Sequence, residues 1–183
     1  AVTCALQMGA DPVAVKKAML DAKPPAGRME RVVLGEKVPF TVFIDYAHTP
    51  DALENILTTV RDFNTGRVIC LFGCGGDRGQ GKRPMMGEIG GKLADLSILT
   101  SDNPRTEDPE AILRDMEQGT TGHTNYLTIT DRAQAIRAAL RMAESGDVVL
   151  VAGKGHEDYQ IIGTEKRHFS DQEHILKYFS KTE

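Results

Sequence analysis

The sequence predicts an α/β protein built on a doubly wound, mostly parallel sheet. Short apolar runs alternate along the chain with stretches whose apolar residues recur at helical spacing. The segments between them are short, which favours right-handed crossovers between parallel strands. The run Asp147–Ala152 is the most apolar of all, so we expect it to be a central strand covered on both faces.

The elements after residue 27 follow this alternation. Strands are expected at Phe40–Asp45, Arg67–Phe72, Leu96–Thr100, Asn125–Ile129 and Asp147–Ala152, with a further strand or hairpin near Tyr159–Ile162. Helices are expected from Thr49-Pro50, over Pro84–Ala94, over Pro109–Gln118 after the cap Asp108, over Asp131–Glu144, and from Ser170, which is predicted to form a capping box with Glu173. The buried side of the helix over Asp131–Glu144 is expected to carry Ala133, Ile136, Leu140 and Ala143.

The amino-terminal segment is expected to belong to a different domain. Asp11 can cap a helix that has Pro12 at its first position, and the pattern predicts a helix over residues 11–22. The stretch KPPAG, residues 23–27, then breaks the helix with two prolines and a glycine. The chain begins without an initiating Met, as a helix already under way. We therefore expect a fragment of a longer protein, with a domain boundary within residues 23–27.

Composition excludes several classes of function. Of the 183 residues, 22 are Lys or Arg and 26 are Asp or Glu, which gives a formal net charge of −4. Nucleic acids and anionic lipids require a basic surface, and the apolar runs are far too short to span a bilayer, so we expect neither partner. The cysteines, Cys4, Cys70 and Cys74, have neither zinc-site nor thioredoxin spacing, which is typical of a cytoplasmic protein with reduced thiols.

Four polar loops follow the predicted strands, and their sequences are DYAHTPD, GCGGDRGQGKR, SDNPRTED and GKGHEDY. The carboxyl ends of parallel strands face the same way, so we expect these loops to meet at one edge of the sheet. In doubly wound sheets the ligand binds beyond this edge. The four loops are therefore the predicted binding site.

The glycine-rich loop has the chemistry of an anion site. Arg78, Lys82 and Arg83 are predicted to project from a loop that leads into a helix N-terminus. From Gly76 the loop matches the phosphate-loop pattern G-x-x-x-x-G-K, but Arg83 replaces the Ser or Thr that holds magnesium. A dinucleotide fingerprint fails too, because Arg78 stands where its third glycine is needed. The alternative is a flexible turn with solvated charges.

The SDNPRTED loop is predicted to hold a ligand that carries both an ammonium and a carboxylate. Pro104 stiffens the backbone beside Asn103, so Asp102, Asn103 and Arg105 present a carboxylate, an amide and a guanidinium close together. Arg can bind a carboxylate through two parallel hydrogen bonds. In the alternative, Asp102 and Arg105 merely pair with each other.

The two remaining loops leave their roles open. Gly153 and Glu157 follow the central strand, where a glycine lets a ligand approach the backbone and a carboxylate can accept from an ammonium. His156 in the same loop is either a base or a structural hydrogen-bonding group. Asp45 and His48 stand at the end of another strand just before a helix, which suits a nucleotide or metal contact and suits helix capping equally.

Taken together, five segments resemble one known family. In order, they are GRME at Gly27–Glu30, DYAHTPDAL at Asp45–Leu53, FGCGGDRGQGKRP at Phe72–Pro84, DNPR at Asp102–Arg105 and AGKGHEDYQ at Ala152–Gln160. They resemble the C-terminal part of the Mur ligases, a Rossmann-like domain that binds the incoming amino acid. The resemblance covers essentially the whole chain. Within the family, DNPR marks the members that add meso-diaminopimelate rather than lysine.

The resemblance implies an ATP-dependent amide ligation in cytoplasmic peptidoglycan synthesis, and so a role in cell-wall biogenesis, cell shape and cell division. ATP phosphorylates the D-glutamate side-chain carboxylate of UDP-N-acetylmuramoyl-L-alanyl-D-glutamate, and the amine of meso-diaminopimelate then displaces the phosphate. Mg²⁺ and cationic side chains offset the charge of the phosphates.

The resemblance also implies that parts of the ligase lie upstream of Ala1. These are the family's G-x-G-K-T phosphate loop, its UDP-sugar-binding domain and the central-domain lysine that the family carbamylates. Residues 1–26 are then the end of the central ATP-binding domain, which holds most of the ATP and Mg²⁺ contacts, and residues 27–183 are the C-terminal domain. We expect this chain to be monomeric and, by itself, catalytically inactive.

Individual residues receive roles from the same resemblance. The residues expected to form the wall that holds the far carboxylate of meso-diaminopimelate are Arg78, Asp102, Asn103, Pro104 and Arg105. Those expected to receive its far ammonium are Gly153, through its carbonyl, and Glu157. Those expected on the ATP side are Arg28, Asp45 and His48. No residue of this chain is assigned to catalysis or to a metal.

Two other classes of protein fit parts of the pattern. A non-catalytic α/β binding module, receiver-like or flavodoxin-like, fits the composition and strand order but does not explain the convergence of charged loops. A lysine-adding relative or a folylpolyglutamate synthetase-like ligase fits the fold, and the DNPR loop argues against both. Amino-acid selectivity and an Arg105 variant distinguish these interpretations.

Overall fold

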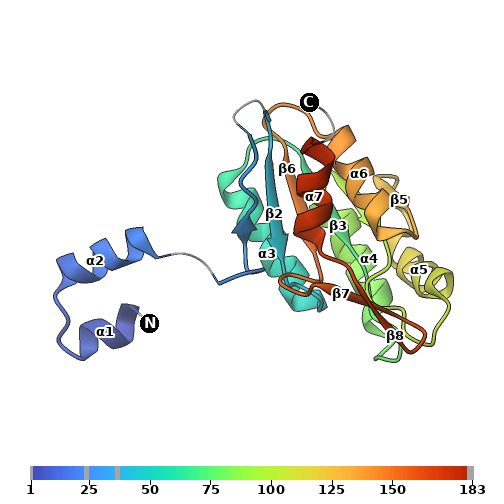
Figure 1. Ribbon diagram of the computed structural model, residues 1–183, viewed down its shortest axis with the longest axis horizontal. Coiled ribbons are helices and arrows are strands. Elements are labelled where there is room, and N and C mark those ends of the chain that lie inside the picture. Colours follow the sequence, from blue (N-terminus) through green and yellow to red (C-terminus); the bar gives the residue numbers. More distant parts are fainter. Residues whose placement is uncertain (1, 23–24, 36–37, 181–183) are drawn as a thin grey trace.

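The computed structural model describes residues 2–22, 25–35 and 38–180. Two helices, α1 (Val2–Gln7) and α2 (Pro12–Asp21), lie apart from an α/β domain that contains the other described elements (Figure 1). Asp11 caps α2 as predicted, because its carboxylate accepts the backbone N–H groups at the start of the helix. Neither helix contains a buried residue. The predicted break at residues 23–27 lies partly outside the described residues.

The main sheet of the described chain has six strands in the order β1-β2-β6-β3-β4-β5. Their bounds are β1 (Glu30–Arg31), β2 (Thr41–Asp45), β3 (Val68–Phe72), β4 (Leu96–Leu99), β5 (Tyr126–Thr128) and β6 (Val148–Ala152). The short edge strand β1, which the sequence analysis did not predict, is antiparallel to β2, and the other neighbouring pairs are parallel. The predicted α/β class, with a mostly parallel sheet and β6 buried near its centre, is confirmed.

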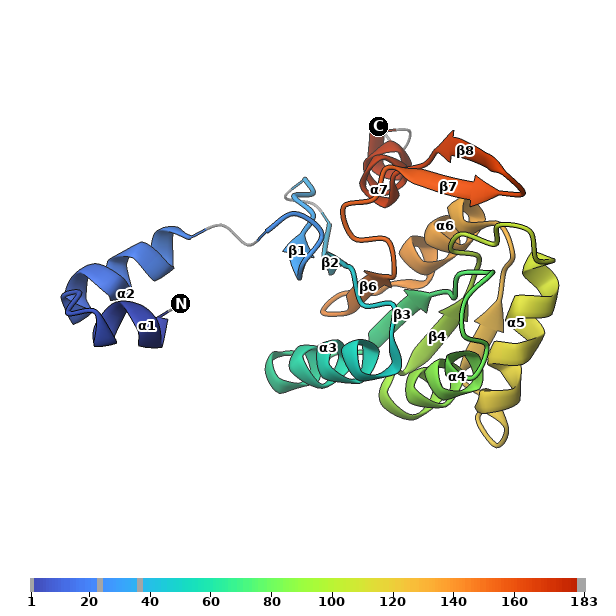
Figure 2. The ribbon, with the colours of Figure 1, turned by 90° about the horizontal axis from the view of Figure 1, so that it is seen from below.

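Helices cover both faces of this sheet (Figure 2). The helices of the first face are α3 (Pro50–Phe63), α4 (Lys82–Leu93) and α5 (Pro109–Glu117), and those of the second are α6 (Arg132–Met142) and α7 (Asp171–Ser180). Alternate residues of β6 serve the two cores, with Leu150 in the first and Val149 and Val151 in the second. This two-sided burial follows from successive side chains of a strand pointing to opposite faces. No helix of the described residues is both long and apolar enough to cross a membrane.

The predicted helix starts are confirmed where a side chain caps the helix, and one is wrong. Thr49, Asp108 and Asp131 each accept a backbone N–H in the first turn of α3, α5 and α6. Helix α4 begins at Lys82, two residues before the predicted Pro84. Proline is tolerated in the first turn of a helix, since the N–H groups there have no partner within the helix.

The predicted capping box of α7 is only half formed. The Ser170 hydroxyl accepts the backbone N–H of Glu173 at 3.3 Å, as predicted. The Glu173 carboxylate lies instead against Nε2 of His168 at 2.7 Å, in the preceding strand. A nearby imidazole has therefore replaced the backbone N–H as the partner of this carboxylate.

The predicted face of α6 is shifted. Ala135, Ile136, Ala139 and Leu140 are buried, whereas Ala133 and Ala143 are only half-buried. A buried salt bridge explains the shift, because the guanidinium of Arg132 turns inward to Asp171 of α7, with both nitrogen–oxygen distances 2.8 Å. Arg132 also donates to the carbonyl of Ala152 at 3.0 Å and so ties both helices to the end of β6.

A second, smaller sheet is the predicted hairpin, formed by β7 (Tyr159–Ile162) and β8 (Glu165–His168). It packs against the loop after β4, since the backbone N–H of Arg105 donates to Ile161 (3.0 Å) and the carbonyl of Arg105 accepts from Gly163 (2.7 Å). Strands β2 and β6 end side by side, because Asp45 lies opposite Ala152 in the parallel register. The polar loops therefore meet at one edge of the sheet, as the sequence predicts.

Candidate functional site

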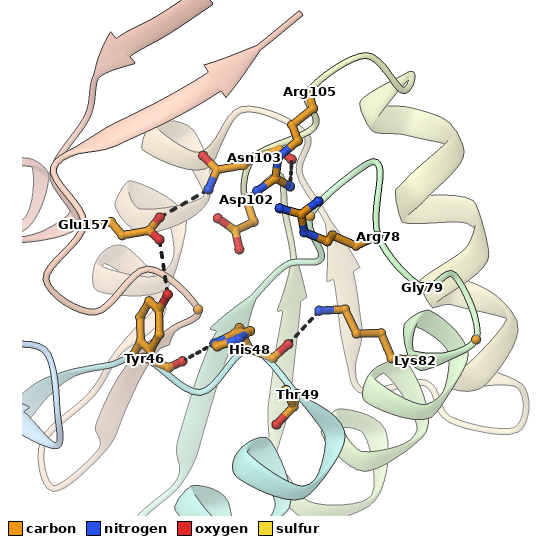
Figure 3. Close-up of a pocket in the computed structure, with 13 residues that line it drawn as sticks. Tyr46, His48, Thr49, Arg78, Gly79, Lys82, Asp102, Asn103, Arg105 and Glu157 are labelled. Atoms are coloured by element: carbon orange, nitrogen blue, oxygen red, sulfur yellow. Dashed lines mark hydrogen bonds between the residues drawn. The ribbon is translucent and has the colours of Figure 1, made fainter. Parts of the chain in front are cut away.

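A cavity of about 610 Å³ opens beyond the carboxyl ends of β2, β3, β4 and β6 (Figure 3). All four predicted loops contribute to it. The predicted site residues that line it are His48, Arg78, Asp102, Asn103, Arg105, Gly153 and Glu157. The predicted residues that do not line it are Arg28, Asp45 and Pro104. Tyr46 and Thr49, which were not among the predicted site residues, also line the cavity.

A fully buried cation, Lys154, lies directly behind the cavity. Its Nζ donates to the side-chain oxygen of Asn103 at 3.0 Å and to the carbonyl of Tyr159 at 2.6 Å. The same nitrogen lies 3.2 Å from Oδ1 of Asp102 and 3.4 Å from Oε2 of Glu157. A buried charge requires partners of opposite charge, so Lys154 holds the carboxylates of two loops together. No role was predicted for Lys154, and its position between two glycines, directly after a buried strand, is the sequence signal that could have found it.

Asn103 is held by the protein on both ends of its amide. Its Oδ1 accepts from Lys154 and from the backbone N–H of Ile161 at 3.0 Å, and its Nδ2 donates to Glu157 at 3.2 Å. These partners fix which way the amide points. Asn103 therefore orients Glu157 and has one remaining N–H for a ligand.

The two arginines of the cavity have side chains that both point into it (Figure 3). Arg105 donates through Nη1 to the carbonyl of Gly76 at 2.8 Å, and Arg78 donates to the carbonyl of Asp77 at 3.0 Å. Asp102, the partner that the alternative interpretation assigned to Arg105, is paired with Lys154 instead. Both guanidiniums bond only to carbonyls, so their charge has no carboxylate partner among these contacts.

Arg83 corrects the predicted anion site. This side chain was predicted to project with Arg78 and Lys82, but it is 1% exposed and points between α4 and α5. Its guanidinium donates to both carboxylate oxygens of Glu107 and to Asp115, all at 2.8 Å. Arg83 is therefore neutralised by the protein and does not reach the cavity.

The loop after β2 contributes an aromatic and an imidazole. The Tyr46 hydroxyl donates to Oε1 of Glu157 at 3.4 Å, and burial, followed by the nearby Glu157 carboxylate, raises the pKa of this phenol. Nδ1 of His48 lies 2.8 Å from the carbonyl of Tyr46 and must donate to it, which leaves Nε2 without that proton in the neutral ring. The carbonyl of His48 accepts from Lys82 at 2.8 Å. His48 therefore keeps one ring nitrogen for a ligand.

Asp45 is neither a helix cap nor an open ligand. It is 8% exposed, and its two oxygens accept the backbone N–H groups of Met29 at 2.7 Å and Ala47 at 2.8 Å. Asp45 thus holds the segment around Met29, whose backbone has a φ of 47°, against the end of β2. Arg28, beside it, is exposed and lies with its guanidinium carbon 5.1 Å from the centre of the Tyr46 ring.

The remaining predicted residues have mainly backbone roles. Pro104 is buried, and its carbonyl lies against Gly76 so closely that any side chain at Gly76 would collide with it. Gly153 has a φ of 114°, which residues with side chains rarely adopt. His156 is exposed, with its ring 5.5 Å from that of Tyr46, and thus touches the site only at its edge.

The cavity combines two signs of charge. Figure 3 shows Glu157 on one side of the cavity, Arg78 and Lys82 on the other, and Asp102 and Arg105, both on the loop after β4, between them. Such a cavity is suited to a ligand with an ammonium and a carboxylate held close together. Among the described residues, no group of three or more His, Cys, Asp or Glu side chains could hold a metal ion.

Known proteins similar to the chain share its loops and its fold. Residues 27–155 match the family described as Mur ligase, glutamate ligase domain. The chain is 54% identical over 183 residues to the UDP-N-acetylmuramoyl-L-alanyl-D-glutamate–2,6-diaminopimelate ligase of Synechocystis sp., in a match that covers 97% of this chain and 36% of the relative. The chain thus spans about a third of the length of the curated relatives it matches.

Solved structures show the same likeness. A UDP-N-acetylmuramoyl-L-alanyl-D-glutamate–2,6-diaminopimelate ligase is 39% identical, with a TM-score of 0.79 over 99% of this chain and 37% of that one. A folylpolyglutamate synthase from Thermotoga maritima is 20% identical, with a TM-score of 0.56 over 79% of this chain and 31% of that one. At that identity, the second likeness shows the fold alone.

Proposed function

The chain belongs to the Mur ligase family through its glutamate ligase domain, and from that membership we propose that it forms the amino-acid site of a longer, cytoplasmic ligase. In this proposal the ligase uses ATP to join meso-diaminopimelate to UDP-N-acetylmuramoyl-L-alanyl-D-glutamate for peptidoglycan synthesis. Two ligases of that name, one of which is a solved structure, match nearly all of this chain. The boundary between residues 26 and 27 remains part of the proposal, and the family match that begins at Gly27 supports it.

One observation carries the choice of amino acid: the cavity sets two carboxylates beside two arginines that no carboxylate among their contacts neutralises. Meso-diaminopimelate has an ammonium and a carboxylate at each end. We assign its far carboxylate to Arg78 and Arg105, and its far ammonium to Glu157 and the Gly153 carbonyl. Asp102 and Asn103 line the space between, and Pro104 supports them from behind.

Selection against lysine follows from the same geometry. Lysine has an ammonium at its far end but no carboxylate, so it would occupy the cavity and leave both guanidiniums without the partner they require. A bound lysine would displace water from the guanidiniums without replacing the hydrogen bonds of that water, and a site built to pair with a group discriminates strongly against an analogue that lacks it. The two arginines therefore favour meso-diaminopimelate over lysine.

The residues on the ATP side fit a nucleotide to different degrees. Arg28 is exposed, and His48 keeps a free ring nitrogen, so both can contact a phosphate or ribose. Asp45 supports the Arg28 segment through its backbone contact and does not itself face the ligand. ATP supplies the phosphoryl group that activates the carboxylate. Mg²⁺ is assigned to no described residue of this chain, in line with our proposal that the preceding domain holds most of the contacts to ATP and Mg²⁺.

Calorimetric titration of the chain with meso-diaminopimelate tests this function, with L-lysine as the matched control. We expect binding of meso-diaminopimelate, and an affinity for lysine that is lower by a factor of about a hundred or more. Equal binding of lysine would show that the assignment of Arg78, Asn103 and Arg105 is wrong. If the chain binds neither, the longer ligase that contains it is titrated, and absence of binding there contradicts the proposed function.

A further inference from the structure

Outside the cavity, a chain of hydrogen bonds joins the two loops that carry the arginines. The Asp77 carboxylate accepts from the hydroxyl of Thr106 at 2.7 Å and from its backbone N–H at 3.3 Å. The backbone N–H of Asp77 donates to Oε1 of Glu107 at 2.6 Å. Asp77 directly precedes Arg78, and Thr106 and Glu107 directly follow Arg105. The contacts therefore connect the backbone beside one arginine to the backbone beside the other.

The chain of contacts is anchored in the core by Arg83. This buried guanidinium donates to both oxygens of Glu107 and to Asp115 of α5. The bond to Arg83 is the main reason that the pKa of Glu107 lies below its usual value, and the bond from Thr106 does the same for Asp77. Both carboxylates therefore stay ionised and able to accept at neutral pH.

Two features of the loops make such an anchor useful. Asp77 and Arg105 have φ values of 54° and 53°, a left-handed backbone that residues with side chains rarely adopt. The guanidiniums of Arg78 and Arg105 also point into one cavity, where like charges repel each other before a ligand arrives. The two loops are also joined beside the cavity, where the backbone N–H of Gly76 donates to the carbonyl of Asn103 at 2.9 Å. The contacts of Asp77 and Glu107 are a second connection, and they hold the backbone at the arginines against the repulsion.

We propose that Glu107 and Asp77 are positioning residues for amino-acid recognition, which set the spacing of Arg78 and Arg105 so that one ligand carboxylate can bind both. Neither residue lines the cavity, and they act through the backbone that carries the arginines. The inference rests on the proposed function, because it assigns the two arginines to a single carboxylate.

A double-mutant cycle separates this role from a general structural one. The variants are Glu107→Ala, Arg78→Met and both together. Calorimetry gives the dissociation constant for meso-diaminopimelate, and the variants are made in this chain if the unmodified chain binds this amino acid, or otherwise in the longer ligase. We expect Glu107→Ala to weaken binding about tenfold alone and less than twofold once Arg78 is absent. A merely structural loss weakens binding by the same factor in both backgrounds.

Two further variants keep the test decisive. Asp108→Asn is the matched control, since Asp108 is the exposed neighbour of Glu107 and pairs with Arg114 on the surface, and its variant should bind normally. Thr106→Val removes only the hydroxyl bond to Asp77 and replaces Glu107→Ala if that variant does not fold; we expect about threefold weaker binding. Equal losses in both backgrounds, or unchanged binding in both Glu107→Ala and Thr106→Val, overturn the inference. Failure of the unmodified protein to bind overturns the proposed function, and this inference falls with it.

Discussion

The two sides of the cavity are built in different ways. The buried wall, formed by Asp102, Asn103, Glu157 and the lysine behind them, is held by hydrogen bonds and ion pairs to Lys154, which is 0% exposed. The arginine wall consists of Arg78, Lys82 and Arg105, whose charged groups donate to backbone carbonyls. One wall has its charges balanced by the protein, whereas the other has charges that await a partner.

Because of this difference, we expect the two walls to have different roles in binding. A charge that is removed from water must be compensated in the folded protein itself, so the buried wall exists before any ligand arrives. An exposed guanidinium costs little to keep unpaired, because water solvates it until a carboxylate replaces that water. Under the proposed function, the buried wall would therefore fix where an ammonium lies, and the arginine wall would decide which amino acid is accepted.

Removal of the buried cation should have the largest effect of any single change in the cavity. In Lys154→Met, the carboxylates of Asp102 and Glu157 lose their shared partner, and the cost of breaking a buried ion pair is about 3–5 kcal/mol. We expect the free energy of unfolding, measured by urea denaturation, to fall by about this amount, and meso-diaminopimelate binding to be lost.

Lys166→Met is the matched control for this change. Lys166 is exposed and lies 3.7 Å from the centre of the Tyr159 ring, so it shares a neighbour with Lys154 without entering the cavity. An exposed cation–π contact contributes about 0.5–1 kcal/mol. If Lys154→Met costs no more than Lys166→Met, the buried wall is not held by its cation and the comparison of the two walls fails.

A substitution in the arginine wall should weaken ligand binding and leave the free energy of unfolding almost unchanged. Arg78 is exposed, so we expect Arg78→Met to change the free energy of unfolding by only about 0.5 kcal/mol or less. Loss of a charge-assisted hydrogen bond to the ligand, about 1.5–3 kcal/mol, should weaken meso-diaminopimelate binding about tenfold to a hundredfold. The gap in affinity between meso-diaminopimelate and lysine should narrow by the same factor.

Arg114→Met provides the control on the same surface, because Arg114 pairs with Asp108 at an exposed site of α5. It should leave both stability and binding unchanged. A large loss of stability in Arg78→Met would show that the arginine wall is also structural, and the division of roles would then be wrong.

The sequence was sufficient for the fold and for the location of the cavity. Apolar periodicity, capping residues and the position of polar loops after strands are local signals, and β6 and the caps of α3, α5 and α6 follow from them. The short strand β1 was missed because two residues at a sheet edge carry no periodicity, and they pair only once β2 is in place.

The two walls were not distinguishable from sequence, because burial of a charge depends on partners far along the chain. Lys154, Arg83 and Arg132 all have the composition of surface residues, and each is buried against carboxylates brought by other elements. Arg83 was therefore expected in the anion site, and Lys154 was given no role. Asp45 was limited to capping or ligand contact, because its partner Met29 lies 16 residues earlier.

The smallest effect concerns the base of the arginine wall, where Cys74 directly precedes the lining residue Gly75. Cys74 is 1% exposed, and burial raises the pKa of its thiol to about 11, so about one thiol in a thousand is ionised at pH 8. The thiolate is the form that reacts with iodoacetamide. At pH 8 we expect rapid alkylation of the exposed Cys4 and almost none of Cys74, measured by mass spectrometry of peptides.

This labelling reports whether the backbone of the arginine wall moves or only its side chains do. If the backbone after β3 stays closed, the slow labelling of Cys74 should be the same with and without meso-diaminopimelate, as it should be for Cys70, which is buried within β3. Labelling of Cys74 that the ligand slows, while the rate at Cys70 stays unchanged, would show that the loop itself opens. The arginine wall would then select its ligand by closing on it, and the contacts between Asp77, Thr106 and Glu107 would be the bonds that break.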